Sequence, residues 1–174
     1  MGLFKNIPTS KKAQLIGDKV MALSQDLKNI ILSYDCININ EESLNGFEYA
    51  LFMYDLECYR QVMTLKHNGF FIETTLRTIF ITMESSNKKA GVNVADGMLF
   101  EMFKKLSNSL HYVYGQAVAQ GLDGLFGIAM YLCSNECGMT EEEVAQNEDL
   151  VRAISKHFNQ IINLPIWTKP FYFR

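Results

Sequence analysis

The sequence predicts an all-α fold, a single-domain bundle of about five helices spanning residues 1–174 with a packed aromatic C-terminal tail. Apolar side chains recur at steps of three and four residues through most of the chain, which is the spacing of an amphipathic helix. Clusters of Gly, Asn and Asp separate these runs, and no segment has the composition of a linker between domains. A length of 174 residues, with 48% hydrophobic and 20% charged residues, suits one globular domain.

The first helix is expected to open after Pro8, with Thr9 or Ser10 as its cap. A second helix should run over residues 42–67. Its apolar residues cover most of the helix circumference, which is typical of a helix packed by neighbours on several sides. The two apolar sets on this second helix are Leu44, Phe47, Leu51, Tyr54, Cys58, Val62 and Leu65, and Phe52, Leu56, Tyr59 and Met63.

A third, shorter helix is expected after Asn68-Gly69, although its Thr and Ile residues also allow a strand. The spacing of Ile72, Leu76, Ile79 and Met83 favours the helix. Residues 85–96 should then form the longest polar loop, with Asp96 as the cap of a fourth helical region. Glycines at positions 115, 121, 124 and 127 predict either a break near residue 121 or a close helix crossing.

The last helix begins with a capping box, in which Thr140 is followed three residues later by Glu143. Val144, Val151, Ile154, Phe158 and Ile161 form its apolar stripe, and Pro165 ends it. Residues 166–174 are rich in aromatic side chains, so we expect them to pack onto the helices.

The charge and the cysteine content indicate where the protein is located in the cell and which kinds of partner it binds. The net charge is −3 and no basic stripe is present, which argues against nucleic acid as a partner. Four cysteines without the apolar run of a signal peptide suggest reduced thiols and a cytoplasmic protein. Residues 110–133 lack Lys, Arg and Glu, but Asp123 makes a buried helix a better interpretation than a membrane span.

The sequence contains no motif for catalysis, metal or cofactor binding. None of its three histidines follows a glutamate by three residues, as a di-iron site in a helical bundle requires, and Gly-x-Ser-x-Gly is missing. His157 is expected to lie away from the apolar stripe of the last helix. We therefore expect no cofactor, no metal and no catalytic residue.

One set of polar residues supports an alternative, a small-ligand-binding or enzymatic protein with a pocket between the second and fourth helices. Glu48 and Asp55 are seven residues apart and share a face of the second helix, where they lie either inward or on an exposed seam. Tyr59 and His111 would complete the ligand-binding residues of that pocket.

The preferred hypothesis is a non-enzymatic cytoplasmic protein that acts by protein–protein association, as an adaptor, an inhibitor or a toxin-neutralising immunity protein. An acidic cluster would attract a partner that carries basic residues. Exposed apolar residues could instead form a homodimer. The predicted partner-binding residues are Glu141, Glu142, Glu143, Glu148 and Asp149.

Overall fold

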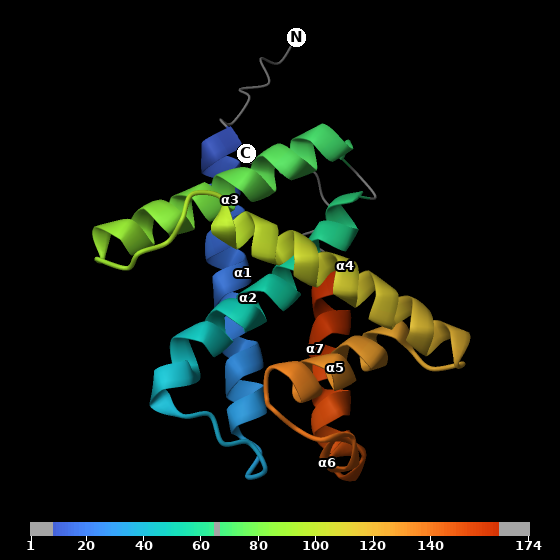
Figure 1. Ribbon diagram of the computed structural model, residues 1–174. Helices are drawn as coiled ribbons and strands as arrows, with labels where there is room; N and C mark the ends of the chain where they lie inside the picture. Colours follow the sequence, from blue (N-terminus) through green and yellow to red (C-terminus); the bar gives the residue numbers. More distant parts are fainter. Residues whose placement is uncertain (1–8, 65–66, 164–174) are drawn as a thin grey trace.

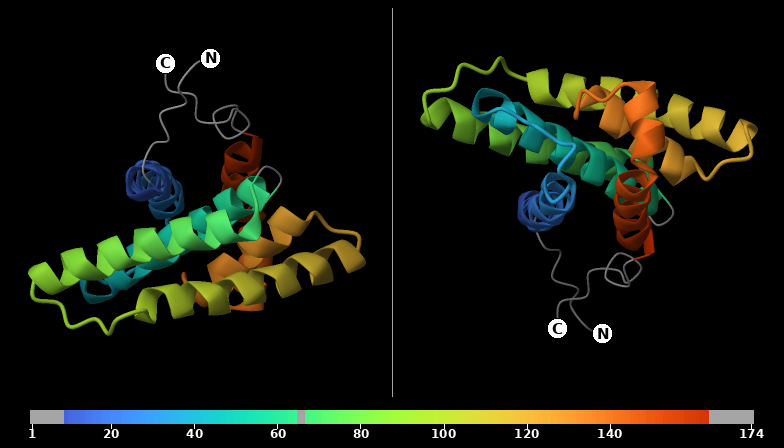
Figure 2. Two further views of the ribbon diagram at one scale, coloured as in Figure 1. Left: turned by 90° about the horizontal axis from the view of Figure 1, so that it is seen from above. Right: turned by 90° about the horizontal axis from the view of Figure 1, so that it is seen from below.

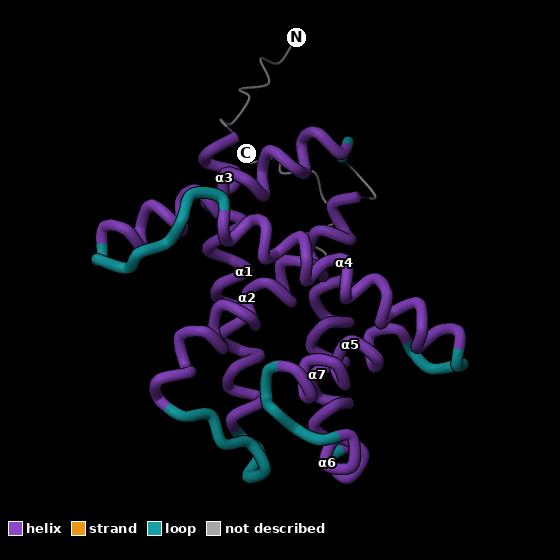
Figure 3. The backbone as a smooth tube through the Cα atoms, viewed as in Figure 1, coloured by secondary structure: helices purple, strands orange, loops and turns teal. Residues whose placement is uncertain are grey.

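The computed structural model describes residues 9–64 and 67–163, and these residues form helices and loops without a strand (Figure 3). The all-α prediction is confirmed, but the described part of the chain has seven helices rather than about five. The helices are α1 (Thr9–Leu32), α2 (Glu41–Thr64), α3 (Gly69–Lys89), α4 (Met98–Ala119), α5 (Gly124–Asn135), α6 (Glu141–Gln146) and α7 (Glu148–Asn163).

The helices form two crossed groups. Helices α1 and α7 pack side by side and run in opposite directions (Figure 1). Seen from above, these two helices are viewed nearly end-on, whereas α3 and α4 run across the view (Figure 2). Helix α2 contacts α1, α7, α3 and α4, so it lies in the middle of the molecule.

The central position of α2 agrees with its sequence, since apolar residues surround most of the helix. All nine residues from 51 to 59 are buried. Phe52 and Leu56 belong to a first core cluster with residues of α1, α3 and α4. Leu51 and Tyr54 belong to a second cluster with α1, α4, α5, α6 and α7. Because α2 supplies residues to both clusters, it joins them into one continuous interior.

The third element is a helix, as the three-four spacing predicts. Its threonines are accommodated because three hydroxyl groups donate to the backbone carbonyl four residues earlier, from Thr75, Thr78 and Thr82 at 2.8–2.9 Å. The helix continues to Lys89, so the expected loop over residues 85–96 is too long by five residues. A hydrogen bond of 2.7 Å from the Tyr49 hydroxyl to Asn87 Oδ1 supports this last part of α3.

Glu84, and not Asp96, caps α4. Gly97 is the N-cap residue and adopts a left-handed backbone conformation with φ of 76°. The buried Glu84 carboxylate accepts hydrogen bonds of 2.9 Å from the N–H groups of Gly97 and Leu99. A carboxylate in this position satisfies N–H groups that the helix itself leaves unpaired. Asp96 instead forms an ion pair with Lys88.

The break expected near residue 121 separates α4 from α5, where Gly121 has φ of +78°. The close crossing that the glycines also suggested is present, because a Cβ added at Gly127 would lie 2.5 Å from the Cβ of Ala117. Residues 110–133 therefore form parts of two helices that pack together. Within the described ranges, no helix has the length and apolar character needed to cross a membrane.

The single last helix of the prediction is in fact two helices, α6 and α7, which meet at Asn147. The capping box is confirmed: Glu143 N–H donates to Thr140 Oγ1, and Thr140 N–H donates to the Glu143 carboxylate. Pro165 and the aromatic tail over residues 166–174 lie outside the described residues.

Candidate functional site

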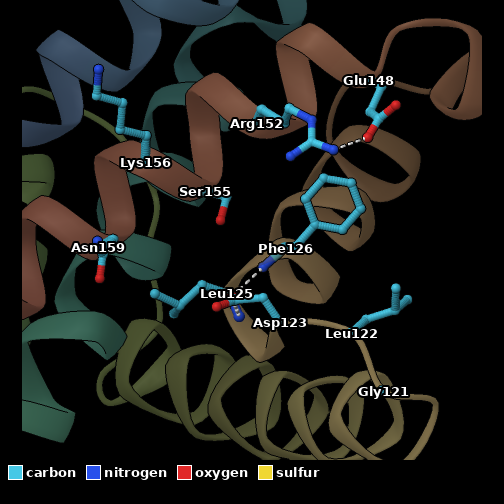
Figure 4. A pocket seen from close by; sticks show the side chains of 10 residues that line it. All are labelled: Gly121, Leu122, Asp123, Leu125, Phe126, Glu148, Arg152, Ser155, Lys156 and Asn159. Atoms are coloured by element: carbon cyan, nitrogen blue, oxygen red, sulfur yellow. Dashed lines mark hydrogen bonds and ion pairs between the residues drawn. The ribbon is translucent and has the colours of Figure 1, made fainter.

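An open groove lies between the start of α5 and one face of α7, with a volume of about 540 Å³ (Figure 4). The α7 side presents residues spaced by three and four positions, so one stripe of the helix lines the groove. Gly121 and Asp123 line the other side of the groove, just before α5 begins. The groove is lined by Gly121, Leu122, Asp123, Leu125, Phe126, Glu148, Arg152, Ser155, Lys156 and Asn159.

Local hydrogen bonds fix the α5 side of this groove. The Asp123 carboxylate accepts from the N–H groups of Leu125 at 2.7 Å and Phe126 at 3.1 Å, which caps α5. The Arg152 guanidinium lies 5.7 Å from the centre of the Phe126 ring and also pairs with Glu148 (Figure 4). Leu122 is 45% exposed beside them. The groove thus combines apolar side chains of Leu122, Leu125 and Phe126 with charged side chains from α7.

The five predicted partner-binding residues are all exposed, and one of them, Glu148, lines this groove. Glu141, Glu142 and Glu143 form the first turn of α6, and Glu148 and Asp149 form the first turn of α7. Glu148 pairs with Arg152, whereas the other four have no cationic partner in the described part of the chain. The backbone of Thr140 donates to Glu143 and holds the pKa of that carboxyl below its usual range.

The four residues of the alternative ligand site do not share one cavity. Glu48 forms an ion pair with Lys28 of α1. Asp55 points to α7, and Tyr59 is buried in the first core cluster. His111 is the one member that lines a pocket between α2 and α4.

Asp55 forms a buried pair with His157, which corrects the expectation that His157 lies away from the apolar stripe. The two side chains are 0% and 4% exposed, and His157 Nε2 lies 3.1 Å and 3.2 Å from the carboxylate oxygens. Burial raises the pKa of Asp55, and the hydrogen bond with His157 opposes that effect. This pair joins α2 to α7, and because both side chains are buried it is not accessible to a substrate.

A second polar cluster surrounds Glu57, and it was not predicted from the sequence. Arg60 donates two hydrogen bonds of 2.7 Å to the Glu57 carboxylate, and Gln61 donates a third at 2.8 Å. Gln61 Nε2 also lies 2.8 Å from His111 Nε2, while His111 Nδ1 lies 2.8 Å from the carbonyl of Ser107. The spacings of three and four residues between Glu57, Arg60 and Gln61 were the available signal.

This cluster forms the polar edge of the pocket between α2 and α4, which has a volume of about 300 Å³. Its other residues are mostly apolar and come from α2, α4, α5 and α7. They include the buried Cys58, whose pKa is raised by burial. The pocket is lined by Glu57, Cys58, Gln61, Leu110, His111, Tyr114, Leu125, Ile128 and Ile162.

Over residues 9–64 and 67–163, no group of three His, Cys, Asp or Glu side chains could hold a metal ion. The four cysteines are all free, with Cys58 and Cys133 buried, Cys137 partly buried and Cys36 exposed. The sequence matches no family model and no curated protein, and the structure matches no solved structure.

Proposed function

We propose that the chain is a non-enzymatic cytoplasmic protein that acts by binding another protein, as an adaptor, an inhibitor or a toxin-neutralising immunity protein. The observation that carries this proposal is that the acidic cluster of α6 and α7 includes Glu148, which lines the α5–α7 groove. An apolar centre with a charged rim is the usual composition of a protein-binding surface.

The chemistry of this surface favours a particular kind of partner. Leu122 and Phe126 offer apolar area for a large aliphatic or aromatic side chain of the partner. Glu141, Glu142 and Asp149 offer carboxylates that are not neutralised by cations of the described chain. A partner segment that carries an apolar anchor followed by Lys or Arg would therefore complement the groove, and the acidic cluster would speed its approach.

The internal pairing of the buried charged residues supports a binding role over an enzymatic one. Asp55 is paired with His157, and Glu57 is held by Arg60 and Gln61. A catalytic acid or base must reach a proton of its substrate by a hydrogen bond. These carboxylates are buried and their hydrogen bonds are made within the molecule.

Site-specific photo-cross-linking in cells tests the proposal. A photoreactive phenylalanine analogue in place of Leu122 should give a cross-linked product with one discrete protein. The matched control replaces Met98, which is 47% exposed compared with 45% for Leu122 and lies at the other end of α4 from the groove. Equal cross-linking from both positions, or none from Leu122, would contradict the proposal.

A further inference from the structure

The pocket between α2, α4, α5 and α7 is separate from the polar part of the α5–α7 groove, with which it shares Leu125. Four helices close it on several sides. Leu110 and Ile128 form buried walls, and Leu125 and Ile162 complete them. An engineered cavity of about 150 Å³ lined by apolar side chains binds benzene. A volume of about 300 Å³ is therefore enough for a molecule with two fused rings.

The charges at the polar edge of this pocket cancel. The Glu57 carboxylate accepts two hydrogen bonds from Arg60, so the one buried anion is neutralised by a cation three residues away. The remaining polar side chains at the edge are those of Gln61, Tyr114 and His111. Gln61 and Tyr114 carry an uncharged amide and an uncharged hydroxyl. His111 Nε2 lies 2.8 Å from Gln61 Nε2 and 3.3 Å from Arg60 Nη2, two donors from which it accepts. A charged ligand would lose its hydration in this pocket without gaining a partner of opposite charge. An uncharged ligand has far less hydration free energy to lose, so its burial costs less.

Two hydrogen-bonding groups at the edge remain available to a ligand. Gln61 uses its Nε2 atom for both Glu57 and His111, and in the described part of the chain its side-chain oxygen, Oε1, has no partner. The Tyr114 hydroxyl likewise has no partner among the described residues. A hydroxyl group of a ligand could donate to the Gln61 oxygen and accept from the Tyr114 hydroxyl.

We propose that this pocket binds an uncharged apolar molecule of one or two rings that carries a hydroxyl group. The apolar walls would hold the rings, and the Gln61 carbonyl with the Tyr114 hydroxyl would hold the hydroxyl group of the ligand. This proposal does not rest on the protein-binding function proposed above, since the pocket shares only Leu125 with the groove and contains no residue of the acidic cluster.

Titration of the full chain with 2-naphthol tests the site. We expect saturable binding with a dissociation constant between about 10 μM and 1 mM, which is usual for a ligand of this size. Methyl shifts in nuclear magnetic resonance spectra should concentrate on Leu110, Leu125, Ile128 and Ile162. Naphthalene-2-sulfonate, an anion with the same rings, should bind at least about tenfold more weakly because the pocket offers no net positive charge.

Two variants and one matched control complete the test. Ile128→Phe should fill the pocket and weaken 2-naphthol binding about tenfold or more, while Ile81→Phe, on the exposed face of α3, should leave it unchanged. Tyr114→Phe removes one hydrogen bond and should weaken binding about fivefold.

Three results would overturn the proposal. The first is a failure of the full chain to bind 2-naphthol. The second is a set of methyl shifts that lie outside the four named residues, a result that does not depend on whether Ile128→Phe folds. The third is binding of naphthalene-2-sulfonate as tight as that of 2-naphthol.

Discussion

Several charged residues are buried in this protein, and each has a partner within the molecule. Asp55 pairs with His157, Glu57 with Arg60, and Glu84 with backbone N–H groups at the start of α4. An unpaired charge in a protein interior costs several kcal/mol, so these partners offset the cost of burying each charge. Asp55 and His157 in particular join α2 to α7.

Replacement of His157 should therefore be strongly destabilising. His157→Ala leaves Asp55 buried without its partner and should lower the free energy of unfolding by about 3 kcal/mol. Lys156→Ala, at the neighbouring exposed position, should change it by less than about 0.5 kcal/mol. Urea denaturation of both variants measures the difference, and equal stability of the two would show that the pair contributes little.

The burial of His157 could have been predicted from the sequence, but its partner could not. His157 lies three residues after Ile154 and four before Ile161, so it falls within the apolar stripe of α7. Its polar neighbour Lys156 suggested otherwise. The partner Asp55 is 102 positions away, and no local pattern reveals a contact of that separation. The same reason explains why Glu48 and Asp55, on one helix face, pair with different helices.

At the level of the helices, α4 and α5 pack closely where glycines of α5 face α4. Gly127 faces Ala117, where an added Cβ would lie 2.5 Å from the Cβ of Ala117. Gly115, in the interior of α4, has nothing within 4 Å of such an atom. These two glycines therefore have different roles, the first in helix packing and the second without a packing requirement.

Alanine substitutions should separate these roles. Gly127→Ala should lower the free energy of unfolding by about 1–3 kcal/mol because the two helices must move apart. Gly115→Ala should raise it by about 0.5–1 kcal/mol because alanine favours the helix without a clash. Thermal and urea unfolding of the two variants, followed by circular dichroism, would show the opposite signs. Equal effects of both substitutions would contradict the packing argument.

The helical character of the segments and their order were predictable because both follow from the spacing of apolar residues. The end of a helix was predictable where the capping residue is close in the sequence. The Thr140–Glu143 capping box is an example. The start of α4 was not, because its cap, Glu84, comes from the preceding helix 13 and 15 residues away. The separation of α6 from α7 at Asn147 was also missed, since the apolar spacing continues from Val144 to Val151 across the break.

At the scale of the whole molecule, the two core clusters meet along α2, and the α5–α7 groove lies at the surface of this interior. The acidic cluster was predictable from the sequence because its members are neighbours in the chain. The groove beside it was not, because it forms between residues of α5 and α7 that are more than 20 positions apart. The proposed function depends on this combination of groove and acidic cluster.

The most direct test of this combination is the rate at which the chain associates with the protein that cross-links to the photoreactive residue at position 122. Glu141→Lys with Glu142→Lys should lower the rate constant about tenfold at low ionic strength, and less at high salt. The matched control is Glu41→Lys with Glu42→Lys, which reverses two exposed charges in the first turn of α2 and should leave the rate nearly unchanged. The same rate for both double variants would contradict a partner that approaches through the acidic cluster.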